Sequence, residues 1–345
     1  MLSIHRKYIL LFACLLFFAA CNSVSIISLN VKVPARIVFP LDINNVMVVN
    51  NAGFQPAGVG HVVDVDGQKE TFEAPVSEPS TLMCRSLWEY LENQNFFSGI
   101  DFYNIPLKND TNYLSVQPLS QNKVKEMIEQ TGTDAVISLD FFRINSTLAV
   151  GKYTEYGIYR ATYDVNTQMT VGIYAPGENR KSLSLSDSIF WESFGTDVND
   201  AVKKLPFIDE ALTTAVERAG EIAGKALVPH IQVENRKLYI SSSGDLKKAY
   251  DSVKKDDWDS ASSIWTTAYE KSKSLRLRAR CAANIALAYE LQDDYTQAAE
   301  WATQARKEFS ASGLRSDAAE AQDLKYYIDR LKQRNAEKIL LDAQE

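Results

Sequence analysis

The sequence DDWDSASSIWTTAYEK at residues 256–271 returns 37 residues later, in altered form, as DDYTQAAEWATQARKE at residues 293–308. Each copy begins with two aspartates and an aromatic residue. Small residues then follow at spacings that share one face of a helix. Such residues let two helix backbones approach closely, because interhelical distance depends on the side chains at the contact. An amphipathic segment precedes each copy, at 246–254 and at 276–291, so the pattern predicts two consecutive helical hairpins.

This pattern resembles the tetratricopeptide repeat, a helical hairpin with a period of about 34 residues. The longer period here predicts an insertion at 271–274, and aspartate or glutamine stands where the family has a turn glycine. Two hairpins bury little apolar surface alone, so we expect a longer helix at 317–341 to cap them. Residues 245–341 are therefore expected to form a tetratricopeptide-like domain, with a generic helical bundle as the alternative.

The composition changes near residue 240, which indicates a domain boundary. All ten prolines lie at or before Pro229, and only Gly244 and Gly313 among the fifteen glycines lie beyond residue 240. Alanine and long polar residues dominate the later part, and these residues favour helices. Residues 241–244, Ser-Ser-Ser-Gly, are the expected linker.

The part before this boundary, residues 33–240, reads as an α+β domain with a mixed or antiparallel sheet. Half-polar alternation in the long β segments is typical of antiparallel strands with one solvated face. The turn at 131–134 resembles the helix-to-strand turn in the amino-terminal module of TolB and of the curli-secretion lipoproteins. The expected strands are 35–40, 46–50, 135–142, 156–174, 182–194 and 231–241; the expected helices are 79–97, 120–130 and 207–227, with a loop at 51–76 that includes a possible hairpin at 66–67.

The first twenty residues predict export. A short basic start at residues 5–7 precedes an apolar run at 8–20, which is too short for a membrane-spanning helix. The run ends in Phe18-Ala19-Ala20-Cys21, which resembles a bacterial lipobox. The resemblance implies a signal peptide at 1–20, a diacylated Cys21 and a membrane partner reached through its lipid. Residues 21–32 would be a tether, although 24–32 could be a first strand; an ordinary secretory signal is the alternative.

Two short motifs extend the resemblance to the whole chain. The stretch PARIVFP at 34–40 and the strand VMVVN at 46–50 are similar to motifs in uncharacterised Bacteroidetes lipoproteins that end in tetratricopeptide-like helices. The resemblance implies location and architecture rather than chemistry. Asn22 and Ser23 carry no acidic run resembling the surface-export signal of that phylum, so we expect an outer-membrane lipoprotein that faces the periplasm.

A basic and polar stripe in the helical part is the main candidate binding site. Arg276, Arg280 and Asn284 recur every four residues and therefore share one helix face, and Lys247 and Lys248 lie on the first helix of the preceding hairpin. In tetratricopeptide domains the first helices line a concave groove, where such side chains can clamp a peptide carboxylate. The stripe thus predicts a protein or peptide partner; a solvated charged face is the alternative.

No motif for catalysis appears, so we expect no enzyme, no cofactor and no metal. The net charge of -7 also argues against a nucleic-acid partner, and three histidines leave little room for a histidine-rich metal site. Cys84 and Cys281 lie in expected helices as buried thiols, with an inter-domain disulfide as the alternative. Three serines follow aspartate in a pattern similar to the Bacteroidetes O-glycosylation acceptor: Ser188, Ser252 and Ser260.

These features together predict a lipid-anchored envelope protein that acts as a protein-interaction scaffold. A glycan-binding envelope lipoprotein is one alternative, and it would need an exposed aromatic platform. The local tyrosine cluster that could supply one is Tyr153, Tyr156, Tyr159 and Tyr163. A second alternative, an enzyme, would need a pocket with converging polar groups within residues 33–240.

Overall fold

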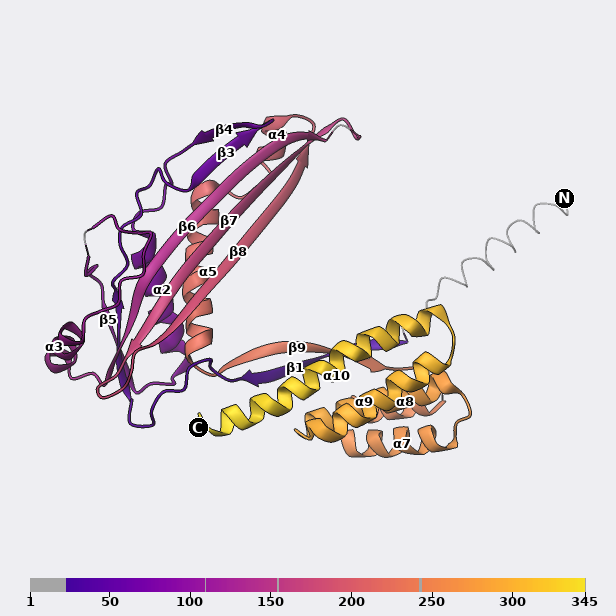
Figure 1. Ribbon diagram of the computed structural model, residues 1–345. Coiled ribbons are helices and arrows are strands. Elements are labelled where there is room, and N and C mark those ends of the chain that lie inside the picture. Colours follow the sequence, from indigo (N-terminus) through magenta and orange to yellow (C-terminus); the bar gives the residue numbers. More distant parts are fainter. Residues whose placement is uncertain (1–22, 109, 154, 242–243, 345) are drawn as a thin grey trace. The chain divides into compact units, whose positions relative to one another are not determined.

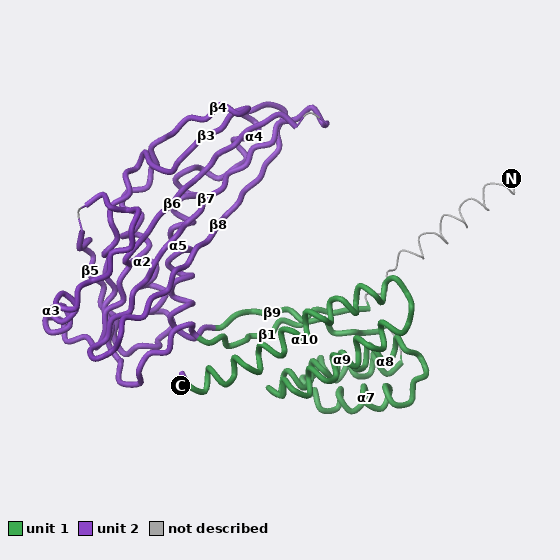
Figure 2. Tube along the Cα trace, viewed as in Figure 1, with its two compact units in different colours: residues 1–34, 231–343, 345 green, residues 35–230, 344 purple. Residues whose placement is uncertain are grey.

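The computed structural model describes residues 23–344 except 109, 154 and 242–243. Two compact units emerge, one built from residues 35–230 and one from 231–343 together with the described residues before 35 (Figure 2). The first unit mixes helices with a sheet and the second is mainly helical, which confirms the predicted fold class. The predicted signal peptide at 1–20 and Cys21 lie outside the described residues.

One long strand organises the sheet of the α+β unit. The first part of β6 pairs in parallel with β2, its later part pairs in parallel with β3, and its other edge pairs antiparallel with β7. β7 continues antiparallel to β8, so the sheet is mixed. The seven strands described in this sheet are β2 (Asn45–Asn50), β3 (His61–Val65), β4 (Gln68–Thr71), β5 (Gly99–Tyr103), β6 (Ala135–Tyr153), β7 (Ile158–Tyr174) and β8 (Lys181–Gly195).

Helices α2 (Pro79–Gln94) and α5 (Ile208–Leu227) lie together on one face of the sheet (Figure 1). Their apolar sides join Val46, Val48 and the inward side chains of β6 and β7 in the main core. Met47 and Val49 point to the opposite face, where α3 (Gln121–Thr131) covers them. β2 is buried on both faces for this reason, which explains its continuous apolar sequence. The short helix α4 (Val198–Val202) packs beside β7 and β8.

The second unit begins with a segment for which the sequence allowed either a tether or a strand. β1 (Val24–Val33) pairs with β9 (His230–Tyr239), and the contacts Ile240 N to Ser23 O and Ser28 Oγ to Asn235 Oδ1 show that the two run antiparallel. The tether prediction for 21–32 is therefore wrong from Val24 onward, because alternate residues of β1 pack on the helices. The helices that follow are α6 (Gly244–Val253), α7 (Trp258–Lys271), α8 (Leu275–Leu291), α9 (Tyr295–Ala311) and α10 (Arg315–Asp342).

The internal repeat appears as two equivalent helical hairpins, α6–α7 and α8–α9. Asp256 and Asp293 occupy the turns with left-handed φ values of 61° and 57°. Asp257 and Asp294 cap the next helices by accepting hydrogen bonds from the backbone N–H groups three residues ahead, at 3.0 and 2.9 Å. Aspartate tolerates the left-handed region better than most residues, so the Asp-Asp pair forms the turn for which the tetratricopeptide family uses a glycine.

Several expected elements differ from the structure. Residues 35–40 form no strand; the backbone N–H of Arg36 instead donates to the carbonyl of Ala226 at 2.8 Å, which ties this segment to α5. β5 and α4 were not predicted, because each spans only five residues, which is too few to show a clear hydrophobic period. Cys84 and Cys281 are buried free thiols, so the disulfide alternative is wrong.

Candidate functional site

Asn284 lies on α8 with its side chain fully buried against β9. Its amide oxygen accepts a hydrogen bond from the backbone N–H of Tyr239, and its amide nitrogen donates to the carbonyl of Tyr239, both at 2.8 Å. One side chain therefore satisfies both backbone groups of a strand residue, as a neighbouring strand would do. The Tyr239 ring packs among the helices, 5.7 Å from that of Phe309.

The other two members of the stripe also face parts of the same chain. Arg276 pairs with Asp317 of α10 at 3.1 Å, and the Asp317 carboxylate is fully buried. The guanidinium of Arg280 lies 6.0 Å from the centre of the Tyr239 ring. The three residues are brought together as predicted, but the prediction of an open groove is wrong here, because β9 and α10 lie against this face.

Lys247 and Lys248 do not take part in this arrangement. Both lie exposed on α6, where Lys247 pairs with Asp251 at 2.7 Å and Lys248 with Asp245 at 3.5 Å. Exposed pairs of this kind contribute little to stability. The two lysines fit the alternative reading of a solvated charged face.

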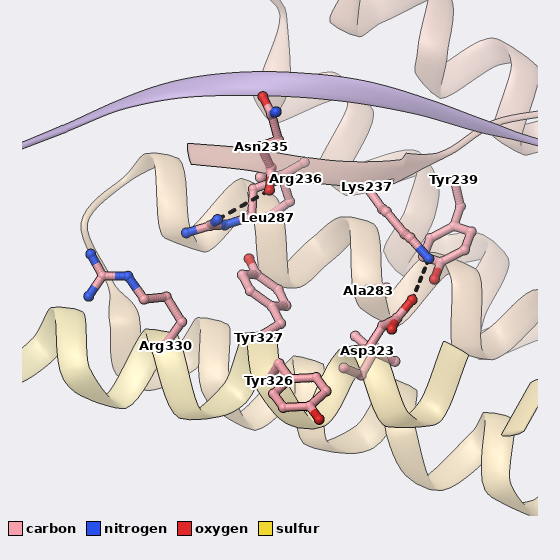
Figure 3. A pocket seen from close by; sticks show the side chains of 11 residues that line it. Asn235, Arg236, Lys237, Tyr239, Ala283, Leu287, Asp323, Tyr326, Tyr327 and Arg330 are labelled. Atoms are coloured by element: carbon pink, nitrogen blue, oxygen red, sulfur yellow. Dashed lines mark hydrogen bonds and ion pairs between the residues drawn. The ribbon is translucent and has the colours of Figure 1, made fainter. Parts of the chain in front are cut away.

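A pocket of about 330 Å³ lies beside the strand that α8 holds (Figure 3). We call it the Tyr326 pocket, after the exposed ring that lines it. It is walled by β9, α8 and α10 through Asn235, Arg236, Lys237, Tyr239, Ala283, Leu287, Asp323, Leu324, Tyr326, Tyr327 and Arg330.

A network of charged side chains fixes one wall of this pocket. Arg236 donates to Glu290 at 2.8 Å and to Glu234 at 2.5 Å, while Arg330 donates to the other oxygen of Glu234. Burial alone would raise the pKa of Glu234, but the hydrogen bonds from Arg330 and Arg236 outweigh it and lower the pKa. Tyr327 adds a hydrogen bond to Glu290 at 2.7 Å. Because each of these charges is partnered, the wall is held rigidly in place.

The mouth of the pocket offers groups that remain accessible. The side chain of Tyr326 is 65% exposed, and Lys237 and Asp323 form an ion pair of 2.6 Å beside it. An aromatic ring next to charges of both signs is suited to a side chain of another protein. We did not predict this site from the sequence, although the alternating charges at Glu234 and Arg236 of β9 were a visible signal.

The tyrosine cluster of the α+β unit is only partly exposed. Tyr153 and Tyr156 are exposed and stacked, with ring centres 5.3 Å apart and planes at 16°, and Phe194 lies 6.3 Å from Tyr153. Tyr159 is half-buried. Tyr163 is buried and donates a hydrogen bond to Ser146, so its place in an exposed platform is wrong.

The three glycosylation candidates lie in different settings. Ser188 is exposed on β8 and donates to Asp164 at 3.0 Å, and Ser260 is exposed in the first turn of α7. Ser252 is half-buried near the end of α6. Their modification stays a prediction.

The described ranges contain neither a metal-binding cluster nor a membrane-spanning helix. No cluster of three or more His, Cys, Asp or Glu side chains is arranged to hold a metal ion. No described helix is both long enough and apolar enough to cross a bilayer.

The fold and site define a class of protein in which an α+β domain with a mixed sheet precedes helical hairpins that hold a strand. The chain belongs to the family of the domain of unknown function DUF8603, whose model matches residues 43–239, more than half of its length. A model of another domain of unknown function, DUF6340, matches residues 247–333. A search of curated proteins found no match.

Solved structures with partial similarity include a minor lipoprotein from Acinetobacter baumannii and a DUF330 protein from Xanthomonas campestris. The first is 9% identical, covers 55% of this chain and 92% of its own, and has a TM-score of 0.26. The second is 9% identical, covers 56% and 90%, and has a TM-score of 0.24. Similarities this low support no inference about function.

Proposed function

We propose that this chain is a lipid-anchored cell-envelope protein that acts as a protein-interaction scaffold through its helical unit, without catalysis. The lipobox-like sequence ending at Cys21 supports the anchor. The resemblance to Bacteroidetes lipoproteins and the missing acidic run after Cys21 favour the periplasmic side of the outer membrane. The hairpins at 245–341 would serve as tetratricopeptide-like modules.

The single observation that carries the scaffold proposal is the way in which α8 holds β9. Asn284 brackets the backbone of an extended segment, and Arg280 lies over the ring of that segment. Recognition of an extended peptide uses the same chemistry, since main-chain hydrogen bonds supply affinity and side-chain pockets supply specificity. Because β9 already fills this face, we place the partner in the adjoining Tyr326 pocket.

Loss of the anchor cysteine is expected to abolish acylation. Replacing Cys21 with serine removes the thiol that would receive the diacylglycerol, and two acyl chains are what make membrane attachment stable. The measurement is radiolabelled palmitate incorporation, together with mass spectrometry of the amino-terminal peptide. Cys14→Ser is the matched control, because Cys14 lies in the apolar run, and it should keep the label. Acylation that survives Cys21→Ser would overturn the anchor.

Truncation of the exposed ring is expected to weaken partner binding. Tyr326→Ala should lower the recovery of a co-purifying protein about tenfold. Truncating a tyrosine at the centre of an interface commonly costs about 1 to 2 kcal/mol of binding free energy or more, and about 1.4 kcal/mol corresponds to a tenfold change in affinity. The measurement is quantitative mass spectrometry after purification of the full lipidated chain from envelopes. Tyr156→Ala is the matched control, because Tyr156 is 67% exposed but lies in the other unit.

The same two variants test the glycan alternative, which the stacked and exposed Tyr153 and Tyr156 favour. Flat aromatic pairs present the apolar face that a sugar ring can stack on. If Tyr156→Ala removes binding to an envelope polysaccharide while Tyr326→Ala changes nothing, the glycan-binding function replaces the scaffold.

Equal partner recovery from both variants and the wild type would contradict the Tyr326 pocket as the docking site.

A further inference from the structure

A separate pocket lies in the α+β unit, within residues 33–240. We call it the His61 pocket, and its volume is about 470 Å³. This volume falls within the range of roughly 300 to 1,000 Å³ that small-molecule sites occupy. Apolar groups dominate its lining, which consists of Phe54, Gln55, Pro56, Ala57, His61, Ala74, Pro75, Val76, Ser77, Glu78, Pro79, Ile144 and Leu212.

Hydrogen bonds hold the walls of this pocket in place. The amide nitrogen of Gln55 donates to the carbonyls of Val59 at 2.8 Å and Ile144 at 2.7 Å, and its oxygen accepts from the N–H of Ile144 at 3.0 Å. The opposite loop is tied by the bond from Ala74 N–H to the carbonyl of Ala57, at 2.8 Å. The pocket is therefore preformed, so a ligand would not have to pay for ordering it.

His61 supplies a polar atom in this mainly apolar lining. Its side chain is 2% exposed, and Nδ1 lies 2.9 Å from the hydroxyl oxygen of Ser146. The hydroxyl of Tyr163 donates to the same oxygen at 3.3 Å. The Ser146 hydroxyl can accept from Tyr163 and donate its own proton to Nδ1, and in that tautomer of His61 the imidazole proton lies on Nε2.

The Nε2–H group has no hydrogen-bond acceptor among the residues that the structure describes. Nε2 is not one of the fully enclosed atoms that lack a hydrogen-bond partner, so it keeps some accessible surface, and an acceptor on a bound molecule would take the place of water there. Burial also lowers the pKa of His61, so the ring is neutral at pH 7. Glu78 is the one carboxylate side chain in this lining, and no lysine or arginine accompanies it, which disfavours an anion.

We infer that the His61 pocket binds a small, uncharged and largely apolar molecule, and that Nε2–H donates a hydrogen bond to a carbonyl or similar acceptor on it. This site is independent of the proposed scaffold function, because its residues all belong to the α+β unit. Its binding would survive even if the helical unit had no partner.

The test uses the chain from Asn22 onward, which keeps every described residue and carries no acyl chain. The probe is 6-propionyl-2-(dimethylamino)naphthalene, a neutral aromatic ketone whose fluorescence shifts to the blue in apolar surroundings. We expect saturable binding with a blue shift. His61→Leu should weaken binding of the ketone about fivefold to tenfold, the effect of one lost hydrogen bond. It should leave binding of the matched 6-propyl analogue, which lacks the carbonyl, within twofold.

Two further measurements keep the proposal open to failure if His61→Leu does not fold. Ala57→Trp places a ring over the pocket at an exposed rim position and should abolish binding, while Phe190→Ala, at an exposed position of β8, should not change it. The infrared carbonyl frequency of the bound ketone should be lower than in hexane. No saturable binding, full binding by Ala57→Trp, an unshifted carbonyl, or equal effects of His61→Leu on both probes would each overturn the inference.

Discussion

Replacing Asn284 with leucine is expected to lower the free energy of local unfolding at β9 by about 3 kcal/mol. The substitution keeps a similar side-chain volume but removes both hydrogen bonds to the backbone of Tyr239. A buried N–H or C=O without a partner costs about 1 to 3 kcal/mol, and here one of each is left. Native-state hydrogen exchange of peptides covering 231–241 measures the effect, because amide protection reports local opening.

Asn235→Leu is the matched control for this experiment. Asn235 is also on β9, but its side chain is exposed and accepts a single hydrogen bond from Ser28 at 2.9 Å. Surface substitutions usually change stability by no more than about 0.5 kcal/mol. Equal loss of protection in both variants would show that Asn284 is not what holds the strand.

The sequence predicted the Asn284 stripe but not what it holds. The four-residue spacing of Arg276, Arg280 and Asn284 was enough to place them on one helix face. Their contacts, however, come from Tyr239 and Asp317, which lie on other elements of the unit. Helical periodicity describes one element at a time, so it cannot say which distant segment covers a face.

The helical hairpins were the most predictable part of the fold. Both copies repeat the same pattern of aspartate, aromatic and alanine, and Asp256 and Asp293 adopt the same left-handed turn. The pairing of β1 with β9 was not predictable, because the two strands are about 200 residues apart in sequence. Long-range strand pairing depends on tertiary packing that a local pattern does not carry.

The pockets were less predictable than the elements. His61 falls within the loop that the sequence predicted at 51–76, whereas the structure buries it at the first residue of β3 beside Ser146 of β6. The Tyr326 pocket likewise combines β9, α8 and α10. Sites formed by several elements depend on the assembled fold, and each contributing residue looks ordinary in its own segment.

A buried carboxylate in the sheet leads to the second large prediction. Asp140 lies at a bulge in β6, where the register with β7 shifts between Leu139 and Phe141. A bulge can re-aim a side chain in this way. The side chain of Asp140 is fully buried and accepts four hydrogen bonds, from Asn51 at 3.0 Å, Ser138 at 2.7 Å, Tyr174 at 2.7 Å and Arg180 at 2.9 Å.

Asp140→Ala is expected to destabilise the α+β unit by about 3 to 5 kcal/mol. Removing one partner of a buried ion pair leaves the other charge uncompensated, and that loss exceeds the net value of the pair itself. Arg180 would be left half-buried, and the hydroxyl of Tyr174 would lose its acceptor. The cluster also reaches the loop before α3, because Asn51 donates to the carbonyl of Gln117. Hydrogen exchange across β6 and β7 measures the change.

Asp164→Ala separates this effect from the loss of any aspartate in the sheet. Asp164 lies on β7, is half-buried and accepts hydrogen bonds from Asn166 and Ser188, both at 3.0 Å, but it forms no ion pair with any cation among the described residues. Its loss should cost no more than about 1 kcal/mol, the net value of ordinary hydrogen bonds. Gly172→Ala provides an independent approach, because a methyl group there would collide with the Asp140 carboxylate and the Tyr174 ring. If Asp140→Ala and Gly172→Ala are both as stable as Asp164→Ala, the buried carboxylate does not hold this sheet together.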